Sequence, residues 1–386
     1  ILRDGNADIL CETIEEDGVQ ILCGSDHLIE VLEYDVNPDF RGNPTIKNIT
    51  LLSLKKCHLI EVQELSFHKV GSFIETMDLS ENKIYKLPSK IFQFVSLNKL
   101  NISNNLLGDL PIDLFKDQNA LEVLDLSGNR IGELNDGIFD HIPLLKRLDL
   151  SRNLMAGQYI TDNLFQSTKI VEYLDLSENI MSLANETILK DLSILHTLFL
   201  DGCYLDSVPK FVLKINMATL THLSMARNEI KYLTSDLNTL ANLNILNLSD
   251  NKITELSLPF NSMSKLKVLN LRSNKIASLP SKLFRTNEHL AHLDLSHNQI
   301  QYVDAYIFHY NSLKSLNLSG NELSYLEDFI LMPGKKFMYM FMYLNEFYFH
   351  DNHWQCACLL ELLKKLLNQI YIFLGYVLFC NATNKI

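Results

Sequence analysis

An eleven-residue pattern recurs thirteen times along the chain and constrains the fold more than any other feature. The pattern is L-x-x-L-x-L-x-x-N-x-L, and residues 121–131 carry an aliphatic residue or asparagine at every fixed position. Eleven of the twelve intervals between successive ninth positions are 23–26 residues long, and the last is 31. Such a register indicates a solenoid, in which each coil buries its apolar face against its neighbours. The ninth position falls at Cys57, Asn82, Asn105, Asn129, Asn153, Asn179, Cys203, Asn228, Asn251, Asn274, Asn298, Asn321 and Asn352.

Each fixed position of the pattern has a physical role. The aliphatic residues at positions 1, 4, 6 and 11 are expected to point into the coil, where each burial contributes roughly 1.5–3 kcal/mol. The alternation around positions 3–5 predicts a short strand with one buried face. Asparagine at position 9 is expected to bond backbone groups that would otherwise cost about 1–3 kcal/mol each. Cys57 and Cys203 replace this asparagine, and we predict buried structural thiols that are neither reactive nor bridged.

The second half of several copies reads Leu-Pro followed by phenylalanine, as in Leu87-Pro88 with Phe92. Proline stops a long helix, so we expect an irregular side opposite the strands. The predicted fold is therefore an α/β solenoid shaped like a horseshoe. It has a parallel β-sheet on the concave face and irregular, 3-10 or short-helical segments on the convex side. The predicted domains are an N-terminal cap with a hairpin (1–45), the repeats (46–343), and a last repeat with a cysteine-containing cap (344–386).

A hairpin is predicted near the N-terminus, over residues 9–23, because Asp17-Gly18 is a turn signal between two apolar segments. Cys11 and Cys23 fall opposite each other if the loop centres near Asp17. We therefore expect them to form a disulfide; the alternative is two free thiols on an exposed hairpin.

The C-terminal region carries Trp354, Cys356 and Cys358, followed by a leucine-rich amphipathic stretch and then Cys380. This resembles the cysteine-flanked cap of extracellular leucine-rich-repeat proteins, although His353 stands where that family usually has proline. Residues 49–358 are similar to Toll-type receptor ectodomains and to secreted insect leucine-rich-repeat immune proteins. The resemblance implies a Cys358–Cys380 disulfide and leaves Cys356 without an assigned partner.

The spacing of His350, His353, Cys356 and Cys358 could also serve zinc. However, His350 falls on position 7 of the last strand, and both cysteines already have a role in the cap. We therefore predict no metal and no cofactor.

Charge and motifs narrow the function classes. The chain has 34 basic and 46 acidic residues, a net charge of −12, whereas a nucleic-acid-binding protein needs a basic face. No hydrolase, zinc-protease, P-loop or dinucleotide motif is present, so an enzyme is not predicted. No apolar run reaches 18 residues, and membrane attachment is expected only through a segment outside this sequence.

Disulfide caps belong in oxidising compartments, so we predict an extracellular protein, secreted or a cell-surface ectodomain. Six N-glycosylation sequons are compatible with this location but are close to the number expected by chance. They begin at Asn48, Asn101, Asn185, Asn247, Asn317 and Asn381. Asn247 and Asn317 occupy position 5 on the concave face, so glycans there would direct a partner toward repeats 4–8 or the flanks.

Position 5 is polar in most copies, but Phe199 interrupts this column in the middle of the array. Arg147, Tyr173, Thr197 and His222 occupy position 3 of adjacent strands, about 4.8 Å apart. Aromatic residues beside arginine are typical of binding hot spots, so these five residues form the predicted binding patch. The competing interpretation is a set of scattered surface side chains without a role.

These features favour an extracellular recognition module, of the innate-immune or receptor-ectodomain kind, that binds a macromolecule on the concave face or flanks. A protein partner is expected, with a glycan or lipid and a homo- or heterodimer left open. The alternatives are a cell-adhesion, neuronal-guidance or matrix protein of the same fold, and a cytosolic repeat protein with reduced cysteines.

Overall fold

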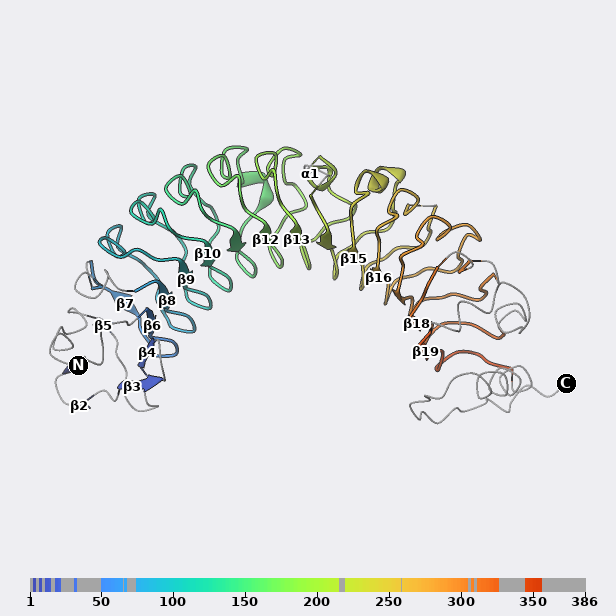
Figure 1. The fold of residues 1–386 in the computed structure, drawn as a ribbon, viewed down its shortest axis with the longest axis horizontal. Helices are drawn as coiled ribbons and strands as arrows, with labels where there is room; N and C mark the ends of the chain where they lie inside the picture. The colour runs from blue at the N-terminus through green and yellow to red at the C-terminus, as the bar shows by residue number, and fades with distance from the viewer. Residues whose placement is uncertain are drawn as a thin grey trace. The chain divides into compact units, whose positions relative to one another are not determined.

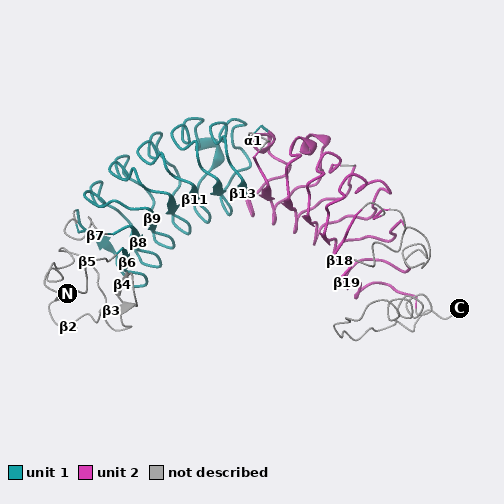
Figure 2. Cartoon of the chain, viewed as in Figure 1, with its two compact units in different colours: residues 1–199, 214–216 teal, residues 200–213, 217–386 magenta. Residues whose placement is uncertain are grey.

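The computed structural model of the chain describes residues 50–64, 66–67, 74–214, 219–257, 259–304, 307–308, 311–325 and 344–355. It also describes the backbone of five short strands within residues 1–49. The chain divides into two compact units (Figure 2). Residues 1–199 and 214–216 form the first unit, and residues 200–213 and 217–386 form the second. The predicted domain boundaries near residues 45 and 343 lie outside the described residues, so they stay predictions.

The first unit stacks its strands into one sheet, with turns on the opposite side of the coils (Figure 1). The strand order is β13-β12-β11-β10-β9-β8-β6-β4-β3, and all neighbours are parallel except the β3–β4 hairpin. The strands are β3 (Cys11–Ile14), β4 (Gly18–Ile21), β6 (Leu51–Ser53), β8 (Thr76–Asp78), β9 (Lys99–Asn101), β10 (Val123–Asp125), β11 (Arg147–Asp149), β12 (Tyr173–Asp175) and β13 (Thr197–Phe199).

The second unit repeats this arrangement with six parallel strands. They are β14 (His222–Ser224), β15 (Ile245–Asn247), β16 (Val268–Asn270), β17 (His292–Asp294), β18 (Ser315–Asn317) and β19 (Glu346–Tyr348). All thirteen predicted repeat strands are therefore present, each at positions 3–5 of its copy.

Few other elements occur in the described chain. Antiparallel β1 (Arg3–Asp4) and β2 (Ala7–Asp8) form one small sheet, and parallel β5 (Val31–Leu32) and β7 (Glu61–Val62) form another. The side opposite the repeat strands carries turns, two 3-10 helices and one α-helical turn: η3 (Gly157–Tyr159), α1 (Lys210–Leu213) and η4 (Ser235–Thr239). The predicted parallel sheet and short, irregular connections are thus confirmed. No helix in the described part is long and apolar enough to cross a membrane.

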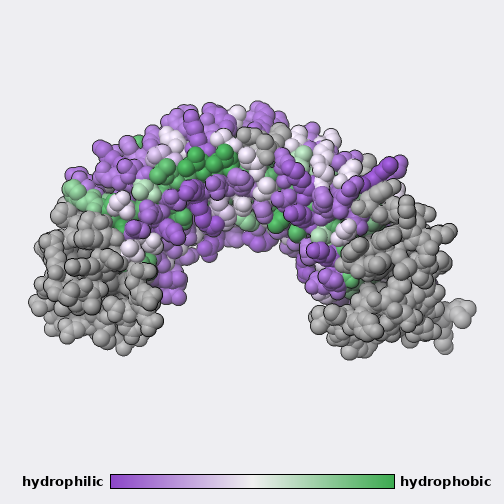
Figure 3. All heavy atoms as spheres, viewed as in Figure 1, coloured by the Kyte–Doolittle hydropathy of each residue, from purple (hydrophilic) through white to green (hydrophobic). Residues whose placement is uncertain are grey.

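The core of each coil is built from the fixed aliphatic positions, joined in most coils by one phenylalanine. Leu121, Leu124, Leu126 and Ile131 of a single copy are all fully buried. Phenylalanines from successive coils stack, as in the Phe260–Phe284 pair with ring centroids 6.2 Å apart. On the face drawn in Figure 3, the described surface is largely hydrophilic, and an apolar strip lies across the first unit.

The asparagine at position 9 joins neighbouring coils, as predicted. Asn129 donates from Nδ2 to the carbonyls of Ile102 and Leu126, both at 3.0 Å, and its Oδ1 accepts the Leu107 N–H at 3.1 Å. The same arrangement recurs at Asn298 in the second unit. Each asparagine therefore satisfies buried backbone groups of its own coil and of the preceding one.

Position 8 adopts a left-handed backbone in all thirteen copies, with φ between 52° and 65°. Only three copies place glycine there: Gly128, Gly202 and Gly320. The other ten place ordinary residues in a conformation that costs roughly 1–2 kcal/mol. The turn therefore keeps this conformation in every copy, including that of Lys56, where position 9 is cysteine.

A second set of buried amides was not predicted. Gln118 donates from Nε2 to the carbonyls of Phe92 and Val95 at 2.9 and 2.8 Å. Asn287 makes the equivalent bonds to Phe260 and Met263 in the second unit. These side chains close the turn after the buried phenylalanine of the preceding coil, so they stabilise the side opposite the sheet.

The cysteines require two corrections. The hairpin is present, but β3 and β4 pair Cys11 with Ile21, so the expected opposition of Cys11 and Cys23 is wrong. Cys203 is buried and forms no disulfide, as predicted. Cys57 is disulfide-bonded, which contradicts its prediction as an unbridged thiol, and its bonding partner lies outside the described residues. Cys23, Cys358, Cys380 and the Cys11 side chain also lie outside them, so the Cys11–Cys23 and Cys358–Cys380 pairings stay predictions.

Candidate functional site

Four of the five predicted patch residues lie together on three adjacent strands of the first unit. Arg147, Tyr173 and Thr197 are in register on β11, β12 and β13. Phe199 lies two residues beyond Thr197 and is directly opposite Asp175. We call Arg147, Tyr173, Thr197 and Phe199 the sheet patch. Position 3 and position 5 side chains point to the same face of a strand, which explains why residues from both columns meet here.

The sheet patch is organised around Tyr173. The Arg147 guanidinium carbon lies 3.4 Å from the centre of the Tyr173 ring, which is a cation–π contact. On the other side, the Tyr173 and Phe199 rings are 5.5 Å apart and tilted by 48°. Arg147 is exposed, whereas Tyr173, Thr197 and Phe199 are each partly exposed. The stack therefore presents a preorganised aromatic surface to solvent.

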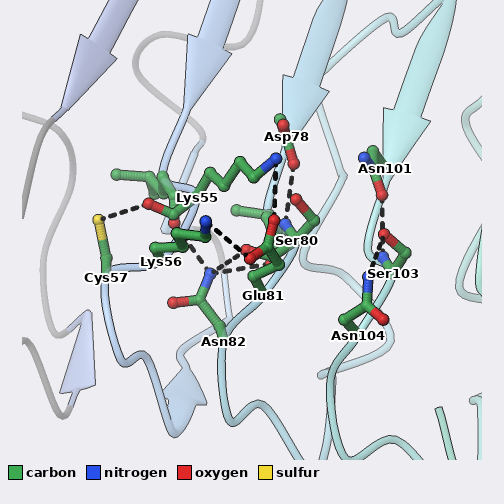
Figure 4. Close-up of polar contacts among 12 residues, drawn as sticks. Lys55, Lys56, Cys57, Asp78, Ser80, Glu81, Asn82, Asn101, Ser103 and Asn104 are labelled. Atoms are coloured by element: carbon green, nitrogen blue, oxygen red, sulfur yellow. Dashed lines mark hydrogen bonds and ion pairs between the residues drawn. The ribbon is translucent and has the colours of Figure 1, made fainter. Parts of the chain in front are cut away.

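A row of carboxylates runs beside the aromatic rings. Asp125, Asp149 and Asp175 are in register on β10, β11 and β12. Each accepts, on Oδ1, the backbone N–H of the serine two residues later at 2.9–3.0 Å. Figure 4 shows the same arrangement at Asp78 with Ser80, where the position is aspartate, and at Asn101 with Ser103, where it is asparagine. An aspartate or asparagine side chain at position 5 is therefore oriented by a hydrogen bond from the residue two positions later.

Two groups in this region have shifted pKa values. Burial raises the pKa of Asp125, although hydrogen bonds from Ser127 oppose the shift, and the neighbouring Asp149 carboxylate raises it further. Burial also raises the pKa of the Tyr173 hydroxyl, with a further contribution from the Asp175 carboxylate. Tyr173 is therefore a neutral ring at physiological pH, and the carboxylates repel one another.

His222, the fifth predicted residue, lies on β14 in the second unit and is partly exposed. Its Nδ1 lies 2.8 Å from the Thr221 hydroxyl oxygen. Its membership of the sheet patch stays a prediction.

The six sequons differ in their environments. Asn185 is exposed on a turn, where its Oδ1 accepts the Thr187 hydroxyl at 3.1 Å. Asn101, Asn247 and Asn317 are partly buried on the sheet, and each holds the serine N–H two residues later. Asn48 and Asn381 lie outside the described residues. Modification at any of the six stays a prediction.

A group of exposed apolar side chains in the first unit was also missed from the sequence. Leu154 and Ile180 occupy position 10 of adjacent coils and are 62% and 49% exposed, and Leu183 is 70% exposed. The coils touch here, because the Ile180 N–H donates to the Met155 carbonyl at 2.8 Å. The available signal was an aliphatic residue at position 10 of two consecutive copies, because most other copies carry a polar residue there and Leu106 and Tyr204 are the exceptions. No group of three or more metal-binding side chains occurs among the described residues.

Comparisons with known proteins agree with this architecture. The family model described as leucine rich repeat matches residues 95–155 and 260–323. No curated protein matches the chain in sequence. A solved leucine-rich-repeat protein of Leptospira interrogans is 23% identical, with a TM-score of 0.69 over 85% of this chain and 91% of that one.

Two further solved structures are similar in fold. The leucine-rich-repeat domain of APL1B is 20% identical, with a TM-score of 0.61 over 86% of this chain and 90% of that one. A chain of the Toll–Spatzle complex of Drosophila is 18% identical, with a TM-score of 0.66 over 90% of this chain and 52% of that one. The present chain thus spans about half of that last chain. The repeats, the family-model matches and the similar structures together show that this chain has the leucine-rich-repeat fold.

Proposed function

We propose that the chain is an extracellular recognition module, of the innate-immune or receptor-ectodomain kind, that binds a protein partner through the sheet patch. The observation that carries the proposal is the Arg147–Tyr173–Phe199 stack on a solvent-facing sheet. The leucine-rich-repeat fold is generally a scaffold for protein binding, and it places such surface side chains on a rigid support.

The composition of the sheet patch suits a binding hot spot. Tyrosine and arginine are enriched among residues that dominate interface energies. Phe199 replaces the polar residue found at this position in most copies. Covering this partly exposed phenylalanine with a partner removes apolar surface from water, which favours binding. The ring contacts with Tyr173 already restrict the side chains, so binding costs less conformational entropy.

The similar structures support a protein partner. One is a Toll–Spatzle complex, described as a hub in development and innate immunity, and another is a complex of LRIM1 with APL1C. The LRIM1/APL1C comparison covers 82% of this chain and 55% of that one, at 21% identity. The extracellular location rests on the predicted disulfides, and the sequons are compatible with it.

A nucleic-acid partner fits less well. One similar structure is a complex of TLR13 with a single-stranded RNA. In the present chain, however, the row of Asp125, Asp149 and Asp175 borders the sheet patch, and the net charge is −12. Phosphate backbones are bound by basic surfaces, so these carboxylates would repel one.

A site-specific crosslink tests the proposal. The chain is secreted from cells with a photo-crosslinking amino acid at Thr197 on β13, and in a control at Val268, which occupies the same position on β16. Each protein is irradiated in extracellular fluid from the source organism. We expect a protein adduct from Thr197 only, reduced at least about tenfold by Phe199→Ser. Equal adducts from both positions, or none from Thr197, would overturn the proposal.

A further inference from the structure

The charges around the sheet patch indicate which charge a partner must carry. This step rests on the proposed function and concerns the same site. Three carboxylates, Asp125, Asp149 and Asp175, lie in register on adjacent strands, whereas Arg147 is the cation that acts on both Asp125 and Tyr173. The local balance is therefore negative. Burial is the main cause of the raised pKa of Asp125, and the neighbouring Asp149 carboxylate adds to it.

The aromatic rings already bind a cation within the chain. The Arg147 guanidinium carbon lies 3.4 Å from the centre of the Tyr173 ring, so the ring faces attract positive charge at this place. Tyr173 in turn packs against Phe199 with ring centroids 5.5 Å apart. Phe199 on β13 thus continues the aromatic surface by one strand beyond Tyr173, the ring that Arg147 covers.

Phe199 and a carboxylate are direct neighbours. The register pairs Phe199 on β13 with Asp175 on β12, and neighbouring strands lie about 4.8 Å apart. The Asp175 carboxylate is oriented by the Ser177 N–H at 2.9 Å. A positive side chain over the Phe199 ring would therefore have an oriented carboxylate within reach, which adds charge pairing to the ring contact.

We propose that the sheet patch binds a basic segment of a protein partner, with an arginine or lysine side chain over Phe199 and its charge paired with Asp175. The three carboxylates then attract the remaining basic residues of that segment along β10–β12. Recognition has two parts: ring contact fixes the anchor side chain, and the carboxylate row selects for positive charge and increases the association rate.

Defined peptides test the charge preference without knowledge of the natural partner. The probe is a fluorescently labelled hexapeptide of alternating glycine and arginine, and its control replaces arginine with glutamate. Binding is measured by fluorescence anisotropy at low and at physiological salt. We expect the arginine peptide to bind and the glutamate peptide not to bind, with weaker arginine binding at the higher salt.

Variants locate the binding on the chain. Asp175→Asn and Phe199→Ser should each weaken arginine-peptide binding at least about fivefold. Both new residues already occur at position 5 elsewhere, as Asn101 and Ser224, so the coils can accommodate them. The matched control is Asp78→Asn on β8, which removes one carboxylate of the same type, bonded to Ser80, away from the rings. It should leave binding within about twofold of the parent.

The outcomes separate this inference from the proposed function. Equal weakening by Asp78→Asn and Asp175→Asn, or equal binding of the two peptides, would show general charge attraction and overturn the inference. If the Thr197 crosslink to a natural partner depends on Phe199 but Phe199→Ser leaves the affinity for the arginine peptide unchanged, the proposed function stands and the basic-segment inference is wrong. If neither crosslink nor peptide responds to Phe199→Ser, both are wrong.

Discussion

The Arg147 guanidinium lies over the ring of Tyr173, with its carbon 3.4 Å from the ring centre, on the next strand of the sheet. The two residues occupy the same position in consecutive copies of the repeat, so the parallel register brings them together. Neither residue is fully buried, and a contact of this kind at an exposed site contributes about 0.5–1 kcal/mol.

A double-mutant cycle measures this contact. Arg147→Ser, Tyr173→Ser and the double variant are compared by urea unfolding. We expect the coupling free energy between the two positions to be about 0.5–1 kcal/mol. Strictly additive losses in unfolding free energy would show that the stacked geometry contributes nothing. Because repeat arrays can unfold in parts, the cycle is read from the transition of the first unit.

Asp125→Asn should stabilise the protein at neutral pH. The raised pKa means that the folded state holds the Asp125 proton more tightly than the unfolded state does. Ionised Asp125 therefore lowers stability as pH rises through the folded pKa, and this loss is absent below the unfolded pKa. An asparagine amide can accept the Ser127 N–H as Asn101 accepts that of Ser103. The gain in melting temperature should thus be largest near pH 7 and vanish in acid; a pH-independent gain would contradict the electrostatic cause.

Asn129→Ala should destabilise the first unit strongly. The change leaves the Ile102 and Leu126 carbonyls and the Leu107 N–H without their side-chain partner. Each buried orphan costs about 1–3 kcal/mol, so the loss should exceed about 3 kcal/mol. Asn163→Ala, at an exposed turn residue, is the control and should cost under about 1 kcal/mol. Similar losses of unfolding free energy for both variants in urea would mean that the asparagine hydrogen bonds are not what joins the coils.

Among the described sequons, Asn185 should carry the most complete glycan. It is exposed on a turn, whereas Asn101, Asn247 and Asn317 are partly buried and hold backbone N–H groups. Site occupancy is measured by peptide mass spectrometry of protein secreted from eukaryotic cells, before and after enzymatic glycan removal, with Asn185→Gln as the control. Higher occupancy at Asn247 or Asn317 than at Asn185 would refute the expectation, and a glycan there would obstruct the sheet of the second unit.

An unreduced peptide map should join Cys57 to another cysteine and show no disulfide at Cys203. The map also decides the predicted pairs. A Cys11–Cys23 peptide would confirm the hairpin disulfide, and a Cys57–Cys23 or Cys57–Cys11 peptide would replace it. Fully reduced cysteines on folded, secreted protein would contradict both the disulfide at Cys57 and the extracellular location.

The sequence by itself determined the solenoid. Leucine spacing alone placed thirteen strands at positions 3–5, and the asparagine found at position 9 of eleven copies identified the hydrogen bonds between coils, because both depend on contacts that recur along the chain. It also placed Arg147, Tyr173, Thr197 and Phe199 on one face, because strand register follows directly from repeat register.

Other features were decided only by tertiary structure, because they depend on how individual side chains meet across coils. Sequence alone could not reveal that Arg147 stacks on Tyr173, that the Asp125 carboxyl is buried enough to raise its pKa, or that Leu154 and Ile180 adjoin on an exposed flank. The hairpin pairing of Cys11 with Ile21 and the disulfide at Cys57 likewise did not follow from the repeat pattern. The repeat pattern determines the backbone of this chain. The properties of residues that depart from the pattern depend on the side chains that contact them in the folded structure.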